Sequence, residues 1–289
     1  MSTRFSEADI ADLIETIVYL DEARGFGLAG LLARVTHCEP DVERIDYAHR
    51  LLMLRQRVLG DAYPFVITST FVGRRDRSRG PNSYIDLLAM SSGTPMRRAM
   101  SQADISECAA CFERMCASAL EHLLGPGGKS VRFAWPSDCG RPPEFPAAVA
   151  WLAVQMGLRL GNGFRPPRRK DGGVDVIAWK SFDDGRTAFP VYLCQCTVQR
   201  DLLSKCSDID IENWSRWLEL LRDPVTALMT PSIIDGGGEL WTELSQRNVI
   251  LDRVRITKLV GATAWLSVQC REKTVGRWLE AGREWLRNC

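Results

Sequence analysis

The chain has 289 residues, with 37 Lys and Arg against 36 Asp and Glu, and 45% of its residues are hydrophobic. This balance excludes an intrinsically disordered chain and a uniformly basic nucleic-acid coat protein, but it allows a local basic patch. No stretch approaches the ~18 consecutive apolar residues of a membrane helix, and the N-terminus MSTRFSEADI lacks the apolar centre of a signal peptide. We therefore expect a globular cytoplasmic protein without a membrane partner.

The cysteines show no framework of regular spacing. In a reducing compartment they are expected to be free thiols, buried as small apolar side chains. The tightest group, Cys108, Cys111 and Cys116, fits one helix face as well as half of a zinc site, but no second CxxC or histidine pair supplies the remaining ligands. The spacing therefore favours buried thiols over zinc.

The first hundred residues show mainly helical patterns. Ser6 and Asp9 resemble a capping box ahead of apolar residues at helical spacing, and a second helix is expected over 41–59. The β-branched and aromatic run 65–72 predicts a strand. We expect a mainly helical N-terminal domain over 1–101 that senses a signal or binds a partner.

Strand and helix patterns alternate in the rest of the chain. A long helix is expected over 102–124, ended by the glycine-rich segment 125–128. Further strands are expected at 131–135, 175–179, 191–197, 224–230 and 254–259, and further helices at 145–158, 209–218 and 273–289. The alternation predicts an α/β domain over 102–289, of the α+β kind and with a C-terminal extension.

Two polar residues stand out in the apolar strands of this domain. Asp175 follows Gly172, Gly173 and Val174, and Gln195 lies near the end of the next strand. If these strands pair as a hairpin, the Asp175 carboxylate and the Gln195 amide oxygen converge at one end of the sheet. Such a pair of oxygens suits a partly hydrated Mg²⁺ or Mn²⁺ ion, which would polarise a phosphate and activate water. The structural alternatives are a turn-capping Asp175 and a buried, hydrogen-bonded Gln195.

This pattern resembles the PD-(D/E)xK nuclease superfamily, in particular its restriction-endonuclease-like branch. There, a Gly-Gly-hydrophobic-Asp strand precedes a strand that ends in Gln-x-Lys; the matching residues here are Gly172, Gly173, Asp175 and Gln195. Over roughly residues 102–235, the resemblance implies a mixed sheet flanked by helices. It also implies a metal-dependent endonuclease that hydrolyses phosphodiester bonds, with DNA as the expected nucleic acid and Asp175 and Gln195 as catalytic metal ligands. Bacterial proteins of this kind commonly serve in restriction or phage defence, as homodimers or with defence-complex partners.

The third motif position departs from the family pattern, because Thr197 occupies the place of its lysine. Lys205, on an expected helix over 200–206, could supply the missing charge beside the scissile phosphate; Lys170 and Lys180 are weaker substitutes. For the acid that the family often adds from an upstream helix, Glu144 has the expected position, whereas Phe112-Glu113 matches the spelling better. Either glutamate could instead be a solvated residue near a helix start.

A basic loop precedes the Asp175 strand. This loop could clamp a nucleic-acid backbone through Arg165, Arg168, Arg169 and Lys170.

Two other functions are also compatible with the sequence. A non-catalytic scaffold or interaction protein could retain the fold without the lysine, and an enzyme of a small phosphorylated substrate could use this loop and the glycine turn as an anion site.

Overall fold

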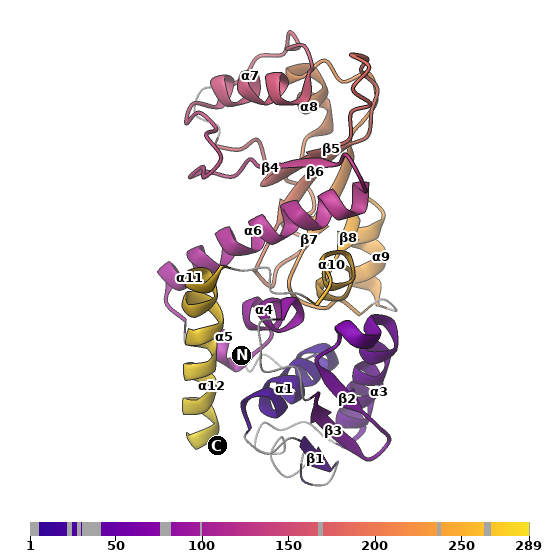
Figure 1. Cartoon of the computed structure of the whole chain (residues 1–289), viewed down its shortest axis with the longest axis vertical. Helices are drawn as coiled ribbons and strands as arrows, with labels where there is room; N and C mark the ends of the chain where they lie inside the picture. The colour runs from indigo at the N-terminus through magenta and orange to yellow at the C-terminus, as the bar shows by residue number, and fades with distance from the viewer. Residues whose placement is uncertain are drawn as a thin grey trace. The chain divides into compact units, whose positions relative to one another are not determined.

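The computed structural model describes residues 6–21, 25–27, 30, 42–75, 82–98, 100–166, 170–235, 238–262 and 267–288. By their contacts, they form two compact units (Figure 1). The first unit is Met1–Cys111, Thr230–Asp235 and Asp252–Cys289, and the second is Phe112–Met229 and Gly236–Leu251. The C-terminal segment, which the sequence analysis grouped with the second domain, therefore packs with the first unit.

The first unit combines helices with a small antiparallel sheet, in which β1 (Gly25–Gly27), β3 (Phe71–Arg74) and β2 (Phe65–Ile67) pair in that order. Its helices are α1 (Glu7–Leu20), α3 (Val42–Leu59), α4 (Ser83–Met90), α5 (Pro95–Arg98), α10 (Arg253–Val260), α11 (Val268–Arg271) and α12 (Arg277–Asn288), with the short helical turns η2 (Gly60–Ala62) and η4 (Glu272–Gly276). Helix α6 (Gln102–Leu124) begins in this unit and continues into the second.

Helix α1 begins at the predicted capping box. The Ser6 hydroxyl accepts the Asp9 N–H at 3.1 Å, and the Asp9 carboxylate accepts the Ser6 N–H at 2.9 Å. Two N–H groups that a helix start leaves unpaired are satisfied in this way. The apolar side of the helix, including Ile10, Leu13 and Ile17, is buried in the core of the first unit.

Two strand predictions in this unit were wrong. The run 65–72 is a hairpin rather than one strand, because the chain turns between Thr68, whose N–H bonds the Phe71 carbonyl at 2.9 Å, and β3. The segment 254–259 lies in helix α10, which starts where the Asp252 side chain accepts the Arg255 N–H at 3.1 Å. Side-chain capping at Asp252 favours the helix despite the β-branched residues.

The core of the first unit also contains charged side chains. Glu15 and Arg253 are fully buried, and Arg55 lies 2.9 Å from Asp12 and 3.0 Å from Glu15. Arg253 pairs with Asp12, while the Tyr84 hydroxyl donates to Glu15 at 2.7 Å. Helices α1, α3 and α10 are thus connected by buried ion pairs, which offset part of the cost of burying the charges, and α4 is joined to them by the Tyr84 hydrogen bond.

One expectation about the cysteines is corrected in this unit. Cys111 of α6 and Cys270 of α11 form a disulfide across 159 residues, where free thiols were expected. Sequence spacing alone could not pair them, because the fold brings the two helices together. Cys108 and Cys116, its neighbours in the sequence, are buried free thiols, as predicted.

The second unit contains a five-stranded mixed sheet in sequential order: β4 (Lys129–Arg132), β5 (Val176–Trp179), β6 (Val191–Cys196), β7 (Val225–Met229) and β8 (Val249–Leu251). β5 is antiparallel to β4 and β6, whereas β6, β7 and β8 are parallel. The helices α7 (Phe145–Met156), α8 (Ile211–Trp217) and α9 (Glu239–Ser245) belong to the same unit. The predicted mixed α/β fold is confirmed.

Helices α7 and α8 share an apolar core with the sheet. Ile177 and Leu193, paired across β5 and β6, pack in one buried cluster with Phe145 of α7 and Trp214 of α8. The Trp214 and Trp217 rings pack edge to face, with their centres 5.3 Å apart, and both are buried, so both tryptophans are core residues.

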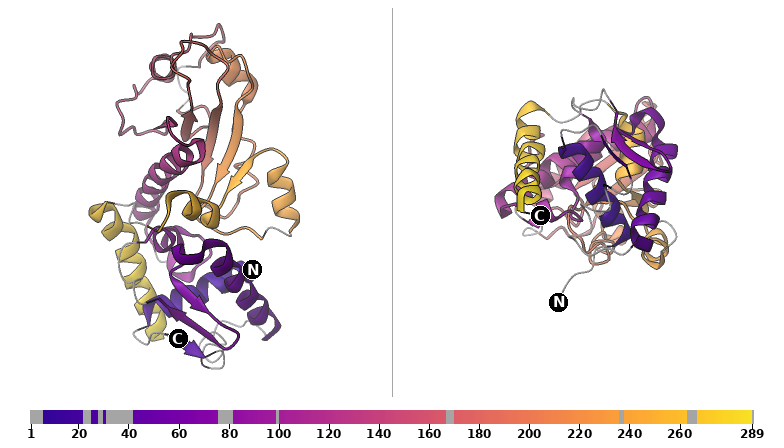
Figure 2. Two further views of the ribbon diagram at one scale, coloured as in Figure 1. Left: turned by 45° about the vertical axis from the view of Figure 1, so that its right-hand side comes forward. Right: turned by 90° about the horizontal axis from the view of Figure 1, so that it is seen from below.

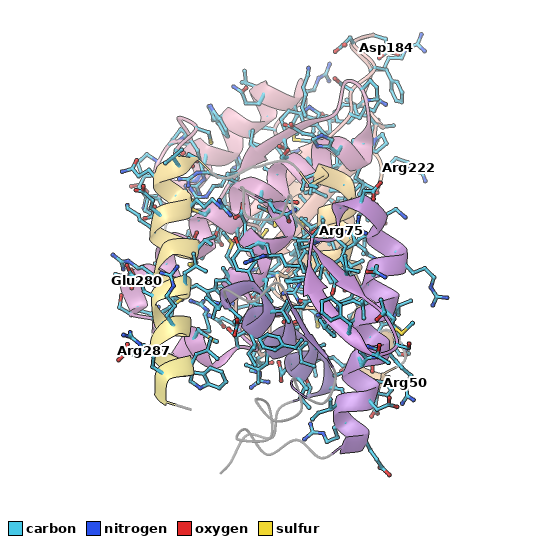
Figure 3. All side chains as sticks on the ribbon, turned by 60° about the horizontal axis from the view of Figure 1, so that its bottom comes forward. Arg50, Arg75, Asp184, Arg222, Glu280 and Arg287 are labelled. Atoms are coloured by element: carbon cyan, nitrogen blue, oxygen red, sulfur yellow. A yellow bond between two sulfur atoms is a disulfide. The ribbon has the colours of Figure 1, made fainter. Side chains whose placement is uncertain are left out.

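Figure 2 shows α6 along the sheet in a second view. Charged side chains such as Arg50, Asp184 and Glu280 are exposed (Figure 3).

Candidate active site at one end of the five-stranded sheet

Asp175 directly precedes β5, and Gln195 lies near the end of the neighbouring strand β6. β5 and β6 pair as the predicted antiparallel hairpin, with Val176 opposite Cys194. The Asp175 N–H donates to the Cys194 carbonyl at 2.8 Å, and the Asp175 carbonyl accepts from Phe133 and Ala134 at 2.7 and 3.0 Å. The backbone on both sides of Asp175 is therefore fixed by β6 and by the segment after β4.

The structure explains why glycine occupies positions 172 and 173, just before Asp175. Both have a positive φ angle, 68° at Gly172 and 79° at Gly173. Residues other than glycine rarely adopt this backbone conformation. A Cβ at Gly173 would lie 2.1 Å from the Asp208 carbonyl oxygen. The Gly172 carbonyl accepts the Trp214 Nε1–H at 3.1 Å. The glycine turn therefore packs against α8 and the segment before it while it delivers Asp175 to the sheet.

The Asp175 carboxylate is almost buried, with 9% of the residue exposed. Its Oδ2 accepts the Cys196 N–H at 2.8 Å. Burial raises the pKa of Asp175 well above its usual range, and the nearby Cys196 and Glu113 raise it further. A bound cation would favour the ionised carboxylate.

The side chain of Gln195 is also buried, and its Oε1 has no hydrogen-bond partner among the residues that the structure describes. A buried carbonyl oxygen without a partner costs free energy, about 1–3 kcal/mol. The alternative of a buried Gln195 bonded through this oxygen to a neighbouring strand therefore has no support here.

Glu113 of α6, rather than Glu144, is the glutamate beside Asp175. It is largely buried; burial raises its pKa to about 7, although the guanidinium of Arg132 opposes this shift. Arg132 Nε donates to Glu113 at 2.6 Å, and its Nη1 donates to the Pro136 carbonyl at 2.6 Å. Glu144 is exposed at the start of α7, makes no capping hydrogen bond, and does not contribute to the pKa shift of Asp175.

Lys205 lies in a turn instead of the predicted helix over 200–206. The Asp201 side chain accepts the Ser204 N–H at 3.2 Å, and such local bonds favour turns over helices. The Lys205 ammonium lies 3.3 Å from Asp208, whose carbonyl packs against Gly173. Lys205 is therefore on the segment beside the glycine turn, paired with Asp208, and the described interactions include none with Asp175 or Gln195.

Thr197, which occupies the position of the family's lysine, and the residues of the basic loop lie in different environments. Thr197 is buried, and its hydroxyl accepts the Gln199 N–H at 3.1 Å. Arg165 donates to the carbonyls of Gly161 and Trp217, at 3.0 and 3.4 Å, so its guanidinium holds the loop to α8. Lys170 is exposed. Arg168 and Arg169 lie outside the described residues.

A cluster of thiols lies behind the acid, and sequence reasoning gave it no role. Cys116 of α6 and Cys194 of β6, both fully buried, donate hydrogen bonds to Cys196, which is partly exposed. Burial opposes ionisation of Cys196, but these two hydrogen bonds and the charge of Arg132 outweigh it and lower its pKa to about 5. The shared strand face of Cys194 and Cys196 was the only sequence pattern that pointed here.

Within the described ranges, no three His, Cys, Asp or Glu side chains form a group that could hold a metal ion. Asp175 offers a carboxylate and Gln195 an unpartnered amide oxygen, from two neighbouring segments of the sheet. Mg²⁺ commonly binds through one or two carboxylates while it keeps several waters. The donor set fits a largely hydrated, hard divalent cation.

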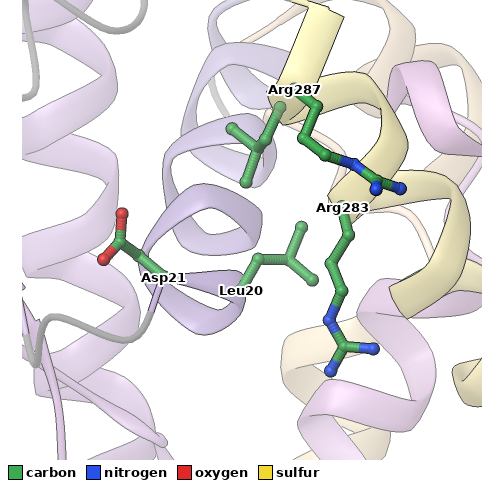
Figure 4. A pocket seen from close by; sticks show the side chains of 5 residues that line it. Leu20, Asp21, Arg283 and Arg287 are labelled. Carbon is green, nitrogen blue, oxygen red and sulfur yellow. The ribbon is translucent and has the colours of Figure 1, made fainter.

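Surface hollows also occur in the first unit. One is lined by Leu20, Asp21, Arg283, Leu286 and Arg287, between the end of α1 and α12 (Figure 4). Another is lined by Glu7, Glu43, Arg44, Tyr47, Arg50 and Asp235. Both have mixed charge and neither includes a buried acid, so they lack the electrostatic character of the Asp175 site.

In comparisons with known proteins, no family model, curated protein or solved structure matches the chain. A search of the described helices found none long and apolar enough to cross a membrane.

Proposed function

We propose that the chain is a metal-dependent nuclease that hydrolyses phosphodiester bonds, with Asp175 and Gln195 as metal ligands. The observation that carries the proposal is the buried Asp175 carboxylate, whose pKa is raised by its surroundings, next to the strand on which Gln195 Oε1 is buried without a partner among the described residues. The glycine turn before Asp175 supports the proposal. The proposed substrate is DNA, and the proposed setting is phage defence in the cytoplasm, alone or with a partner.

Each residue of the site has a distinct task in this proposal. Asp175 and Gln195 hold the ion, and Glu113, which is half ionised near pH 7, adds a third oxygen or accepts a proton from water. The bound Mg²⁺ or Mn²⁺ would polarise the phosphate and lower the pKa of the attacking water. Arg132 keeps Glu113 in position, and Lys205, after it leaves Asp208, would balance the negative charge on the phosphate.

The test compares cleavage of plasmid and single-stranded DNA in Mg²⁺ or Mn²⁺ by the wild type, Asp175→Asn and Asp184→Asn. Asp184 is an exposed carboxylate in the β5–β6 connection and serves as the matched control. We expect Asp175→Asn to lose activity by about two orders of magnitude or more, and Asp184→Asn to keep it. Cleavage that survives Asp175→Asn would remove the assignment.

A non-catalytic scaffold or interaction protein is the second candidate. Two observations favour it: Thr197 is buried and hydrogen-bonded in the lysine position, and the Lys205 ammonium is paired with Asp208. A thermal-shift titration with Mg²⁺ and Mn²⁺ separates the two functions, because a ligand that binds only the folded state raises the melting temperature. A scaffold without a metal site shows no such rise.

A further inference from the structure

An exposed tryptophan lies directly beside the Asp175 site. Trp135 is 44% exposed and follows Ala134, whose N–H donates to the Asp175 carbonyl at 3.0 Å. Single exposed apolar residues are common on protein surfaces and need no function. What sets Trp135 apart is how its indole is held and what surrounds it.

The segment that carries Trp135 is fixed on both sides. Arg132, which also binds Glu113, donates to the Pro136 carbonyl at 2.6 Å. The guanidinium of Arg141 lies 4.4 Å from the centre of the Phe133 ring and 5.7 Å from that of Trp135. Because Arg141 is only 3% exposed, it acts as a buried cation behind the indole. The backbone that carries the indole is therefore fixed before any ligand arrives, and Arg141 lies within cation–π distance of the ring, which lowers the entropic cost of binding.

Positive charge continues from this indole toward the basic loop. Arg141 donates to the carbonyl oxygens of Pro142, at 3.2 Å, and of Lys170. Lys170 is exposed, and no described residue forms an ion pair with its ammonium. One guanidinium thus connects the exposed Trp135 with the backbone of the exposed Lys170, next to the proposed catalytic acid.

We propose that Trp135 is a stacking platform for an unpaired base of the nucleic acid, with Lys170 at its phosphate. This inference rests on the proposed function for the class of ligand. An indole can stack only on a base whose own face is free, so the substrate is single-stranded, or unpaired at the position next to the scissile bond. A paired and stacked duplex offers Trp135 no such face.

The test measures binding without cleavage, by fluorescence anisotropy of labelled oligo-dT and of a blunt duplex in EDTA. Base–aromatic stacking contributes about 1–3 kcal/mol, so Trp135→Ala is expected to raise the Kd for oligo-dT by about tenfold, and Trp135→Phe by less. The matched control is Phe182→Ala, an exposed aromatic of the β5–β6 connection, which is expected to bind as the wild type does. Duplex binding by Trp135→Ala is expected to be unchanged.

Three results would overturn the stacking role: an unchanged Kd of Trp135→Ala for oligo-dT, an equal loss for duplex and oligo-dT, or no oligo-dT binding by the wild type. Since Trp135→Phe preserves an aromatic side chain, retention of most of its affinity separates stacking from a folding defect. Asp175→Asn distinguishes this inference from the proposed function. If that variant binds oligo-dT and still cleaves, the catalytic assignment fails while the stacking result stands.

Discussion

The backbone N–H of Cys196 donates a 2.8 Å hydrogen bond to the carboxylate of Asp175. The same residue thus stabilises the proposed metal ligand through its main chain and accepts hydrogen bonds from two thiols through its side chain. Because Gln195 precedes Cys196 on β6, both proposed metal ligands depend on the position of this strand end. The acid site and the thiol cluster form one connected structure.

Asp175→Asn should stabilise the metal-free protein increasingly as pH rises. The pKa of Asp175 in the folded state is raised, so the folded chain keeps a proton that the unfolded chain loses, and wild-type stability falls as pH rises above the unfolded value near 4. Asparagine carries no such penalty. The difference in melting temperature between variant and wild type should therefore grow from pH 4 to pH 8.

Asp184→Asn is the control for that experiment, because its carboxylate is exposed. A difference between Asp175→Asn and wild type that stays constant from pH 4 to pH 8 would contradict the raised pKa. Addition of Mg²⁺ at pH 8 should raise the melting temperature of the wild type and leave Asp175→Asn unaffected.

Metal affinity should depend on pH through Glu113. Its pKa of about 7 means that it is mainly protonated at pH 6 and ionised at pH 8. A ligand must lose its proton to bind a cation, so below pH 7 each unit of pH should weaken apparent Mg²⁺ affinity by up to about tenfold. Glu113→Gln should bind Mg²⁺ more weakly and lose the part of the pH dependence between 6 and 8 that Glu113 contributes. Glu144→Gln is the matched control; a wild-type affinity independent of pH would remove Glu113 from the site.

Cys196 should react as a thiolate at pH values where ordinary thiols are protonated. With a pKa of about 5, its alkylation rate by iodoacetamide should change little between pH 6 and pH 8. A free cysteine with a pKa near 8.5 becomes nearly a hundredfold more reactive over that range, by roughly the ratio of its thiolate fractions. Peptide mass spectrometry locates the label, and Cys196→Ser verifies it. A steep rise like that of free cysteine would contradict the two thiol hydrogen bonds.

The sequence predicted the elements that local patterns determine. Helix α6 has the expected bounds because a long periodic run meets the terminator Gly125–Gly128. The hairpin of β5 and β6 was also predictable, because its two strands show period-two alternation and the turn-forming Asp183-Asp184-Gly185 lies between them. The two strand errors arose where short side-chain caps and turns decide between conformations.

The sequence did not predict which residues surround the candidate site. Glu113 lies 62 positions from Asp175 by number, and only the packing of α6 along the sheet brings it near. Cys116 reaches Cys196 for the same reason, and the Cys111–Cys270 disulfide spans most of the chain. These contacts depend on how helices pack, which spacing within one element does not determine.

The last prediction concerns the glycine turn, and the chain offers a close control. Gly173 and Gly185 both have positive φ, 79° and 71°, so an alanine strains the backbone at either position by about 1–2 kcal/mol. At Gly185 a Cβ has nothing within 4 Å, whereas at Gly173 it would meet the Asp208 carbonyl at 2.1 Å. Gly173→Ala should therefore lower the free energy of unfolding by at least ~2 kcal/mol more than Gly185→Ala, measured in urea. It should also weaken Mg²⁺ binding, because relief of the clash moves Asp175. Equal losses in the two variants would mean that the contact with Asp208 does not constrain the turn.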